Sequence, residues 1–306
     1  MNARDLENPT EEHRMLRQMC RDFARTVLEP QAEEQDRRGC LNVELMRKVG
    51  ELGLHGITIP AEHGGGGLDA VAAVIAHHEL SKADPGFTLA YLAHAMLFVN
   101  NFFYAGAEPV REKYLAKVIS GELIGAMGMT EPGVGTDVLG MTTTAREDGD
   151  RFILRGQKSL ITNAPEADVF LVYAKVEGRV TSFVVERAFA GVSTPSKFPK
   201  MGMRASSLGE IVLEDVVVRR ERLLGGVGGG VSNMMRKLEI ERLTLAEMSL
   251  GIADRCMEIM VQYAEGRKSF GKSLAEHGQI QRYIGESYAK TEAARALVYS
   301  VAHKTS

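Results

Sequence analysis

The chain has 306 residues, 44% of them hydrophobic and 25% charged, so it has the composition of an ordinary globular protein and room for about two folded domains. Its formal net charge of -3 provides no broad positive field, which argues against a nucleic-acid or an anionic-membrane partner. The three cysteines have no metal-binding spacing, the first residues have no apolar signal-peptide core, and no run of about 18 apolar residues occurs, so we expect no metal site, no membrane span and a cytoplasmic location.

The first part of the chain has the periodicity of α-helices. Leu16, Met19 and Phe23 recur at helical spacing, and a helical pattern returns over residues 70–81. Thr10, which precedes two acidic residues, is the predicted N-cap of the first helix. We therefore expect an N-terminal helical domain over residues 1–124.

The period changes after Gly125, where short β-type runs are separated by Gly, Pro and Asp turn signals. Because helices do not alternate with these runs, we expect a compact, β-barrel-like domain over residues 125–230 rather than a dinucleotide-binding fold. The predicted strands cover residues 151–154, 169–176, 181–185 and 210–213.

From residue 231 the pattern is helical again, with a break near Gly271. We expect a C-terminal helical domain over residues 231–306. The order along the chain is helices, strands and helices, without βαβ alternation. This order predicts the α+β class.

The segment over residues 127–137, with the sequence MGMTEPGVGTD, is rich in glycine and hydroxyl side chains. Thr130, Gly135 and Thr136 offer hydroxyl and amide donors in a loop that Pro132 restrains, and glycine lets the backbone approach a bound group closely. Such a loop can contact a flavin ring or a phosphate, although on composition alone an ordinary surface loop is the commoner explanation.

Together with a second segment, residues 156–168 (GQKSLITNAPEAD), this loop resembles the two flavin-contacting segments of the acyl-CoA dehydrogenase family. The family has an N-terminal helical domain, a β domain and a C-terminal four-helix bundle, so the resemblance implies that this chain carries only about half of that bundle. Several stretches look closest to the isovaleryl-CoA dehydrogenase branch. Further similar stretches begin at Gly56 (GITIPAEHGG), Val169 (VFLVYAK), Lys200 (KMGMRASS), Ile240 (IERLTLA) and Gly266 (GRKSFGK).

The resemblance implies an FAD-dependent oxidation of a short or branched-chain acyl-CoA thioester to its trans-2-enoyl form. A carboxylate removes the proton alpha to the carbonyl while a hydride leaves the beta carbon for flavin N5, so the protein supplies one base and donors to the flavin and the thioester oxygen. It also implies a homo-oligomer (a tetramer or a dimer) or a chain that supplies the other bundle helices. Electron-transfer flavoprotein is the usual electron acceptor in the family.

Glu241 is the predicted base. After the glycine-rich segment that ends at Gly230, an apolar residue recurs every seven positions and predicts a core-facing helix face (Leu238, Leu245, Ile252 and Ile259). At about 100° per residue, Glu241 falls on this face, whereas Glu247 and the other nearby carboxylates point elsewhere. A carboxylate on a buried face tends to have a raised pKa, as a general base near neutral pH requires. An ion pair with Arg242 is the alternative; the resemblance favours catalysis, because in the isovaleryl branch the base is the Glu of this Glu-Arg pair.

The other site residues follow from the resemblance. Arg267, at a helix end, could on the sequence alone be only a solvated cation. The predicted flavin contacts are Met127, Met129, Thr130, Gly135, Thr136, Leu160, Ile161 and Thr162, with Arg267 and Phe270 reaching the cofactor of a neighbouring subunit. The predicted substrate contacts are Thr136, Glu239 and Arg242.

Two residues depart from the family's pattern. Leu160 stands where an aromatic residue, usually Trp, packs against the flavin, and Gly278 stands where a Gln normally contacts the partner subunit's cofactor. In the last predicted helix, an apolar face from Ile280 to Val301 would have to be covered by another chain or by rearrangement. These departures keep open an alternative function, a non-catalytic, flavin-less homologue or fragment that acts as a structural subunit. A carrier-protein thioester in place of the CoA thioester is a third possibility.

Overall fold

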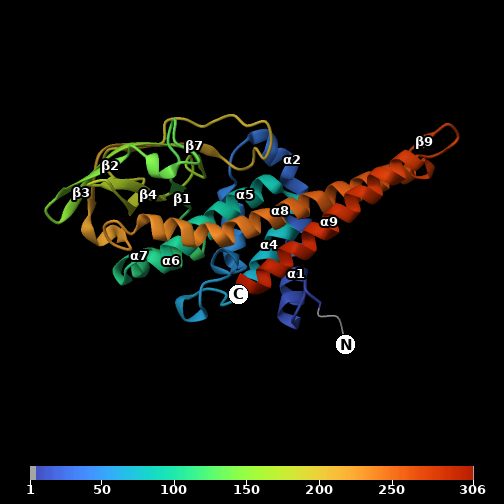
Figure 1. The fold of residues 1–306 in the computed structure, drawn as a ribbon, viewed down its shortest axis with the longest axis horizontal. Helices are drawn as coiled ribbons and strands as arrows, with labels where there is room; N and C mark the ends of the chain where they lie inside the picture. Colours follow the sequence, from blue (N-terminus) through green and yellow to red (C-terminus); the bar gives the residue numbers. More distant parts are fainter. Residues whose placement is uncertain (1–4, 306) are drawn as a thin grey trace. The chain divides into compact units, whose positions relative to one another are not determined.

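The structure, a computed structural model, describes residues 5–305 apart from the side chains of residues 236 and 237. Residues 1–4 and Ser306 of the predicted first and third domains therefore lie outside the described part. The elements follow the predicted order of helices, strands and helices (Figure 1). The first helices are α1 (Glu11–Phe23), α2 (Glu29–Arg38), α3 (Val43–Glu51), α4 (Ala70–Ala83), α5 (Pro85–Leu92), α6 (Asn100–Ala105) and α7 (Glu108–Ile119).

The strands and the C-terminal helices complete the predicted α+β fold, which is confirmed. The chain also breaks near Gly271 as predicted, at a short hairpin between the last two helices. The strands are β1 (Gly125–Gly128), β2 (Thr144–Asp148), β3 (Arg151–Thr162), β4 (Val169–Val176), β5 (Arg179–Glu186), β6 (Val192–Ser193), β7 (Leu208–Arg219) and β8 (Leu223–Leu224). They are followed by α8 (Gly230–Gly266), the hairpin strands β9 (Lys268–Ser269) and β10 (Lys272–Ser273), and α9 (Gly278–Thr305).

The chain divides into two compact units, each made of several segments. Unit 1 consists of Met1–Ala32, Asp69–Thr88 and Arg242–Ser306, and unit 2 of Glu33–Leu68 and Leu89–Glu241. The division into domains at residues 124 and 230 stays a prediction.

Unit 2 contains a mixed sheet with the strand order β6-β7-β3-β2-β4-β5-β8, and β1 pairs in parallel with β4. Each predicted strand is present. The strands β3 and β7 are longer than predicted because they pair with each other along most of their length, with irregularities after Leu154 and after Lys158. Such bulges interrupt the alternation of side chains that a sequence pattern relies on.

Helices of unit 2 pack directly on this sheet through a close contact at Gly125. A Cβ atom at Gly125 would lie 2.1 Å from the ring of Phe98, so only glycine fits. Phe98 belongs to a buried apolar cluster, which also includes Phe102, Tyr114 and Val184. This cluster joins the helices to the strand that leads into the 127–137 segment.

Unit 1 is built around α4, on which α1 and α9 pack. The predicted start of α1 is confirmed, since the Thr10 side chain accepts a hydrogen bond from the backbone of His13. Buried charges join the helices: Glu79 of α4 accepts a 3.0 Å hydrogen bond from Arg17 of α1, and Arg17 donates another to the hydroxyl of Tyr299 in α9 at 2.7 Å.

The prediction for the faces of α8 is wrong. Leu245 is 36% and Ile259 is 53% exposed, so the apolar stripe is not the buried face. Glu247, which was expected to point away from the core, is fully buried and forms a 2.8 Å hydrogen bond with His78 of α4. At Gly251, one turn later, a Cβ atom would lie 2.1 Å from the Ser81 hydroxyl oxygen. The sequence pattern failed because a buried carboxylate with a polar partner cannot be told from a surface residue by hydropathy.

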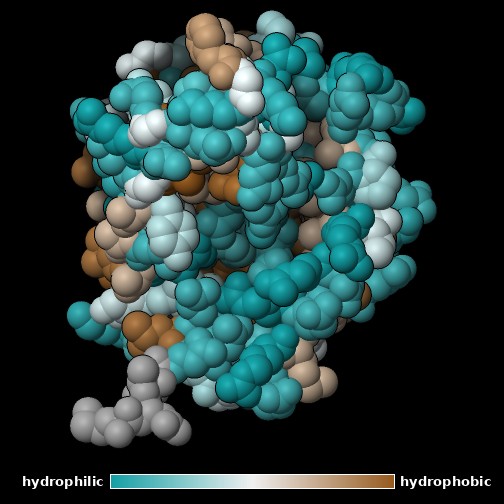
Figure 2. Space-filling view, turned by 90° about the vertical axis from the view of Figure 1, so that its right-hand side faces the viewer, coloured by the Kyte–Doolittle hydropathy of each residue, from teal (hydrophilic) through white to brown (hydrophobic). Residues whose placement is uncertain are grey.

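Along α9 the predicted apolar face is only partly covered within the described residues. Tyr288 is 59% and Val301 41% exposed, whereas Val298 is buried. The face of the molecule in Figure 2 is mostly hydrophilic, with smaller hydrophobic areas between. Within residues 5–305 no helix is long and apolar enough to cross a membrane.

Candidate active site

The 129–143 loop of unit 2, which follows β1, contains four of the predicted flavin contacts: Met129, Thr130, Gly135 and Thr136. At its start the backbones of Glu131 and Val134 exchange two 3.0 Å hydrogen bonds across Pro132 and Gly133. Pro132 occupies the first central position of this turn, where its ring restrains φ. Gly133 occupies the second central position, and its φ of 83° is one that favours glycine. The turn fixes the direction in which Gly135 leaves the sheet.

The Glu131 carboxylate closes the loop. It accepts hydrogen bonds from the backbone of Thr142 (2.6 Å), the hydroxyl of Thr142 (2.7 Å) and the backbone of Thr143 (3.0 Å). It also forms a 2.8 Å ion pair with Lys158 of β3, and both side chains are buried. The backbone of Ser159 donates a further hydrogen bond to the Thr130 carbonyl at 2.9 Å. These contacts hold both ends of the loop against β3.

The buried Glu131–Lys158 pair is stable because both carboxylate oxygens of Glu131 and the ammonium group of Lys158 form hydrogen bonds. Burial alone would raise the pKa of Glu131, but the hydrogen bonds from Lys158, Thr143 and Thr142 outweigh it and lower the pKa to about 2. Burial lowers the pKa of Lys158, and the contact with Glu131 opposes that effect. Glu131 is therefore ionised and structural, and it is unsuited to proton transfer near neutral pH.

The hydroxyls that the loop carries are available to a ligand. Thr136 is exposed and Thr130 half-buried, and within residues 5–305 neither hydroxyl forms a hydrogen bond. Gly135 is exposed, and a Cβ atom placed on it would meet nothing within 4 Å. The loop thus presents donors on an open side, and their contact with a flavin stays a prediction.

Beside the loop, the end of β3 presents an apolar surface. Leu160 is 56% exposed and has a φ of 57°, a left-handed conformation that is unfavourable for leucine. Ile161 behind it is buried, and Thr162 is half-buried. Asn163 follows with a φ of 66° and donates a 2.9 Å hydrogen bond to the Ala90 carbonyl, which fixes this irregular backbone. An exposed leucine on fixed left-handed backbone is the kind of feature that a bound ring would cover.

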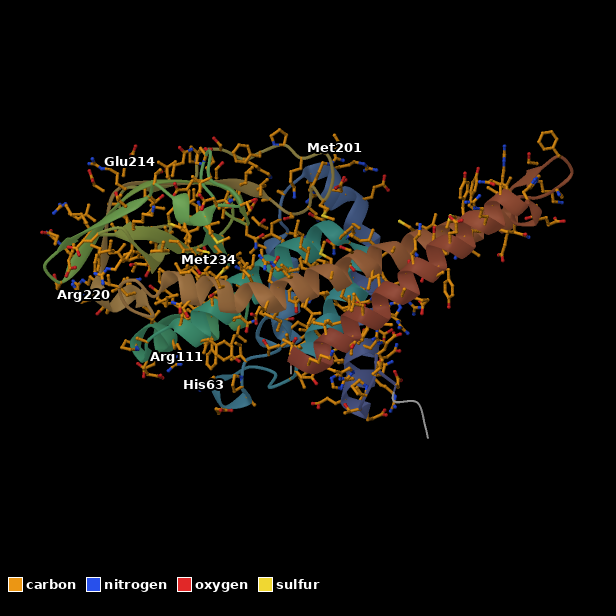
Figure 3. The ribbon with its side chains drawn as sticks, viewed as in Figure 1. His63, Arg111, Met201, Glu214, Arg220 and Met234 are labelled. Atoms are coloured by element: carbon orange, nitrogen blue, oxygen red, sulfur yellow. The ribbon has the colours of Figure 1, made fainter. Side chains whose placement is uncertain are left out.

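The predicted base lies on α8, whose first turns meet the same cluster as the start of the loop. Met234 is buried in the apolar cluster of unit 2 (Figure 3), and Leu238, one turn later, packs against it. Met127 and Met129 pack against this cluster too. Glu241, a further turn along, is half-buried. The structure therefore brings the helix that carries Glu241 to the start of the loop.

The other predicted site residues are placed differently. Glu239 and Arg242 are exposed on α8. Arg267 and Phe270 belong to unit 1, at the end of α8 and in the β9–β10 turn, and Phe270 is 97% exposed with a φ of 50°. Gly278 is the first residue of α9 and is exposed. The roles of Glu239, Arg242, Arg267 and Phe270 stay predictions.

Sequence reasoning missed that Glu131 and Lys158 form the structural centre of the loop. The local sequence offered little signal, since Glu131 stands between Thr130 and Pro132 and Lys158 between two polar residues, where a charged side chain is ordinary. Their pairing could not be read from the sequence because they are 27 positions apart, Glu131 in the loop and Lys158 on β3.

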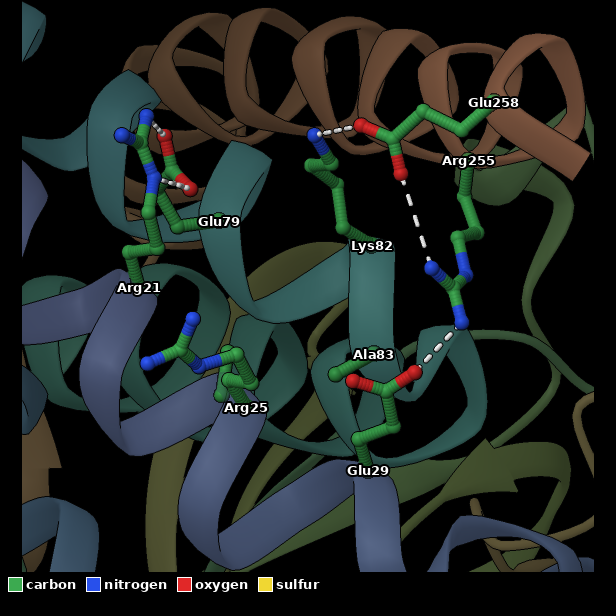
Figure 4. Close-up of a pocket in the computed structure, with 9 residues that line it drawn as sticks. Arg21, Arg25, Glu29, Glu79, Lys82, Ala83, Arg255 and Glu258 are labelled. Carbon is green, nitrogen blue, oxygen red and sulfur yellow. Dashed lines mark hydrogen bonds and ion pairs between the residues drawn. The ribbon is translucent and has the colours of Figure 1, made fainter. Parts of the chain in front are cut away.

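A pocket of about 180 Å³ within unit 1 is not a second candidate for the flavin (Figure 4). Among the described residues, every charged side chain that lines it except Arg25 forms an ion pair with another lining residue, so it offers few free donors to a large cofactor. The pairs are Arg21 with Glu79, Lys82 with Glu258, and Arg255 with both Glu29 and Glu258.

The loop and the end of β3 together fit a flavin. Hydroxyls and amides over residues 130–136 can donate to its polar edge, and Leu160 provides an apolar surface. Among residues 5–305 no group of His, Cys, Asp and Glu side chains could hold a metal ion.

Comparison with known proteins identifies one family along the whole chain. Residues 10–122 match the acyl-CoA dehydrogenase N-terminal domain, residues 126–216 its middle domain, and residues 228–306 its C-terminal domain.

Two curated relatives are isovaleryl-CoA dehydrogenases of mitochondria. The protein from Pongo abelii is 38% identical, over 96% of this chain and 71% of its own length. The protein from Arabidopsis thaliana is 39% identical, over 92% of this chain and 70% of its own length.

Solved structures show the same fold. A chain in the structure of an electron-transferring flavoprotein of Acidaminococcus fermentans matches with a TM-score of 0.94 and 36% identity, over 97% of this chain and 80% of that chain. An acyl-CoA dehydrogenase complexed with FAD from Bacillus anthracis matches with a TM-score of 0.90 and 38% identity, over 95% of this chain and 50% of that chain.

Proposed function

Because the chain belongs to the acyl-CoA dehydrogenase family of FAD-dependent oxidoreductases, we propose that it oxidises a short or branched-chain acyl-CoA between its alpha and beta carbons, with Glu241 as the base. One observation carries this proposal. Within unit 2, the loop that Glu131 and Lys158 anchor and the α8 turns that lead to Glu241 meet on one apolar cluster.

The chain's own residues bind and orient the flavin in this proposal. Thr130, Gly135 and Thr136 donate to its polar edge, and the Glu131 anchor fixes these donors before the flavin binds, which lowers the entropy lost on binding. Leu160, Ile161 and Thr162 line the ring, with Met127 and Met129 at the other side of the loop. When bound, FAD supplies the acceptor at N5 for the hydride that leaves the beta carbon.

Glu241 takes the proton from the alpha carbon. Its half-buried position on a continuous helix restricts the carboxylate, and partial exclusion of water favours proton transfer from a weakly acidic carbon. Arg242 and Glu239, on either side along α8, are proposed to contact the substrate. Thr136 also contacts it.

The proposed partners follow from the relatives. Arg267 and Phe270 would contact the flavin of a neighbouring subunit in a homo-oligomer, and their exposure leaves them accessible to one. Electron-transfer flavoprotein is the proposed electron acceptor, supported by the structural similarity to a chain from an electron-transferring flavoprotein structure. A cytoplasmic location stays a prediction, and curated relatives include mitochondrial proteins.

The visible absorption spectrum of the purified chain, before and after addition of isovaleryl-CoA, tests the proposal. We expect a flavin band that bleaches on addition of the thioester. In Glu241→Gln the band should remain and the rate of bleaching should fall by about 10²–10⁴-fold. Glu265→Gln, an exposed carboxylate further along the same helix, is the control and should bleach at the normal rate. Normal bleaching by Glu241→Gln would exclude Glu241 as the base.

A non-catalytic, flavin-less protein is the second candidate, and Leu160 is the observation that favours it. A leucine cannot stack on a flavin ring as an aromatic residue does, and here it is 56% exposed. A colourless protein that takes up no added FAD would establish this alternative.

A further inference from the structure

A pocket of about 440 Å³ in unit 2 carries charges that the proposed dehydrogenation does not use. Its walls come from the last residues of α2 and from residues 197–207, the loop that leads into β7. At the exposed turn of this loop, Met201 points to solvent (Figure 3). Four of the lining side chains are cationic: Arg38, Lys197, Lys200 and Arg204.

The two lysines of this pocket lack compensating carboxylates. Each arginine forms an ion pair: Arg204 with Asp36 at 2.6 Å, and Arg38 with Glu34 at 2.9 Å. Within residues 5–305, neither Lys197 nor Lys200 forms an ion pair. Lys200 is half-buried, and burial lowers the pKa of its ammonium group even though the nearby charge of Asp36, which pairs with Arg204, acts to raise it. An anion in the pocket would remove this penalty.

A buried hydroxyl also lines the pocket without a partner. The side chain of Ser206 is fully buried, and its oxygen forms no hydrogen bond within the described residues. Its neighbour Ser207 is satisfied, since it donates to Glu166 at 2.7 Å and accepts from the backbone of Leu41 at 3.0 Å. Leaving a buried donor unpaired is unfavourable, so Ser206 marks a place where an acceptor belongs.

The negative groups around the pocket do not cancel the cations. Asp36 and Glu34 each neutralise one arginine, and burial raises the pKa of Glu166, which favours its neutral form. The carbonyl end of α2 adds about half a negative charge at most. The two unpaired lysines therefore leave the pocket positive.

We propose that this pocket binds a phosphate group, either free or carried by an ester. Lys197 and Lys200 supply the unpaired positive charge, and Ser206 donates a hydrogen bond to a phosphate oxygen, which accepts strongly because it is charged. The volume exceeds what one phosphate needs, and Phe198 adds an aromatic wall, so the pocket has room for the organic part of an ester. The site is separate from the residues assigned to dehydrogenation.

Calorimetric titration of the full chain with inorganic phosphate, at an ionic strength held constant with chloride, tests this proposal. We expect saturable binding that Lys200→Gln weakens by about tenfold or more and Ser206→Ala by about threefold or more. Lys48→Gln removes an exposed lysine of unit 2 that lies outside the pocket, and it should bind phosphate as the wild type does. Lys197→Gln changes an exposed side chain, so it still gives an answer if a buried variant fails to fold.

The source of the phosphate is distinguished by a second titration with adenosine monophosphate. Binding tighter than that of inorganic phosphate, and still weakened by Lys197→Gln, would indicate an ester ligand, and equal binding would indicate free phosphate. Absence of saturable binding of both probes, or equal weakening by Lys48→Gln, would overturn the proposal.

Discussion

The two units use buried charge in different ways. In unit 1, ionic groups from separate helices form the contacts between them: Glu79 with Arg17, and Glu247 and Asp254 with His78. In unit 2 an apolar cluster joins helices to the sheet. There the Glu131–Lys158 pair holds a loop rather than the core. The comparison indicates that buried charge specifies helix packing in unit 1 and the shape of the site in unit 2.

The largest effect is expected at the unit 2 pair. Glu131→Gln leaves Lys158 buried without its counter-ion, and the free energy of unfolding should fall by about 3–5 kcal/mol. Chemical denaturation measures this, and FAD affinity should fall with it because the loop loses its anchor. Glu122→Gln, at an exposed ion pair of the same unit, should change the free energy by less than about 0.5 kcal/mol.

The double variant Glu131→Gln/Lys158→Met separates charge from packing. Removal of both charges should restore most of the lost stability, since a buried pair contributes little beyond its own desolvation. A double variant as unstable as Glu131→Gln would show that the ion pair is not the cause. FAD affinity should stay low in both variants, because a glutamine has one side-chain oxygen and cannot accept all the hydrogen bonds from Thr142 and Thr143 that both oxygens of Glu131 accept.

A smaller loss is expected in unit 1. Glu79→Gln leaves Arg17, which is mostly buried, with weaker acceptors, and should lower the free energy of unfolding by about 2–4 kcal/mol. The second partner, Arg21, is about half exposed and should contribute little. Glu11→Gln, which breaks an exposed pair on α1, is the matched control. If the folded Glu79→Gln protein also lost FAD, the division of roles between the units would be wrong.

The units should also respond differently to pH. In unit 2, burial lowers the pKa of His94 to about 4. Its Nδ1 atom accepts from the backbone of Gly125 at 3.0 Å, so protonation there would break a structural hydrogen bond. In unit 1, burial acts to lower the pKa of His78, but hydrogen bonds with Asp254 and Glu247 have the larger, opposite effect. The pKa of His78 is therefore raised.

The signs follow from linkage. Histidine in the unfolded chain binds a proton near pH 6.5, whereas folded His94 does so only near pH 4. The free energy of unfolding therefore has its full value above pH 6.5 and falls by about 3 kcal/mol as the pH drops toward 4. The contribution of His78 is present below pH 6.5 and lost as the pH rises through its folded pKa. Proton NMR of the imidazoles measures both. Titration of His94 near pH 6.5, or of His78 below it, would contradict the assignment.

The same comparison explains what the sequence could and could not predict. The strands of unit 2 and the Thr10 cap were predictable because they depend on residues that are close in sequence. The buried face of α8 was not, because Glu247 is buried only by virtue of His78, on a helix far away along the chain. A hydropathy pattern contains no information about such a partner. The proposal that Glu241 is the base therefore depends on the family and on the neighbours of Glu241 along α8, and not on the apolar stripe.

Within the candidate site, the hydroxyl and amide donors were predictable from composition and from the resemblance, whereas their anchoring was not. The left-handed backbone at Leu160 was equally hidden, because leucine rarely adopts it and nothing in the local sequence requires it. It arises where β3 departs from regular pairing with β7, between Lys158 and Ile161.

The smallest predicted effect concerns this strained residue. A left-handed conformation destabilises leucine by about 1–2 kcal/mol, and Leu160→Gly removes that strain while it adds about 0.5–1 kcal/mol of unfolded-chain entropy. Leu160 is largely exposed, so little packing is lost, and the free energy of unfolding without FAD should rise by up to about 1 kcal/mol. FAD affinity should fall several-fold, because the apolar surface beside the loop is removed. In unit 1, Leu297→Gly removes a leucine of similar exposure from regular helix and should lower the free energy of unfolding by about 1 kcal/mol. If the free energy of unfolding rises in Leu160→Gly and falls in Leu297→Gly, the backbone at Leu160 is strained at the surface proposed to meet the flavin. If it falls equally in both variants, Leu160 is held by packing and its backbone is not strained.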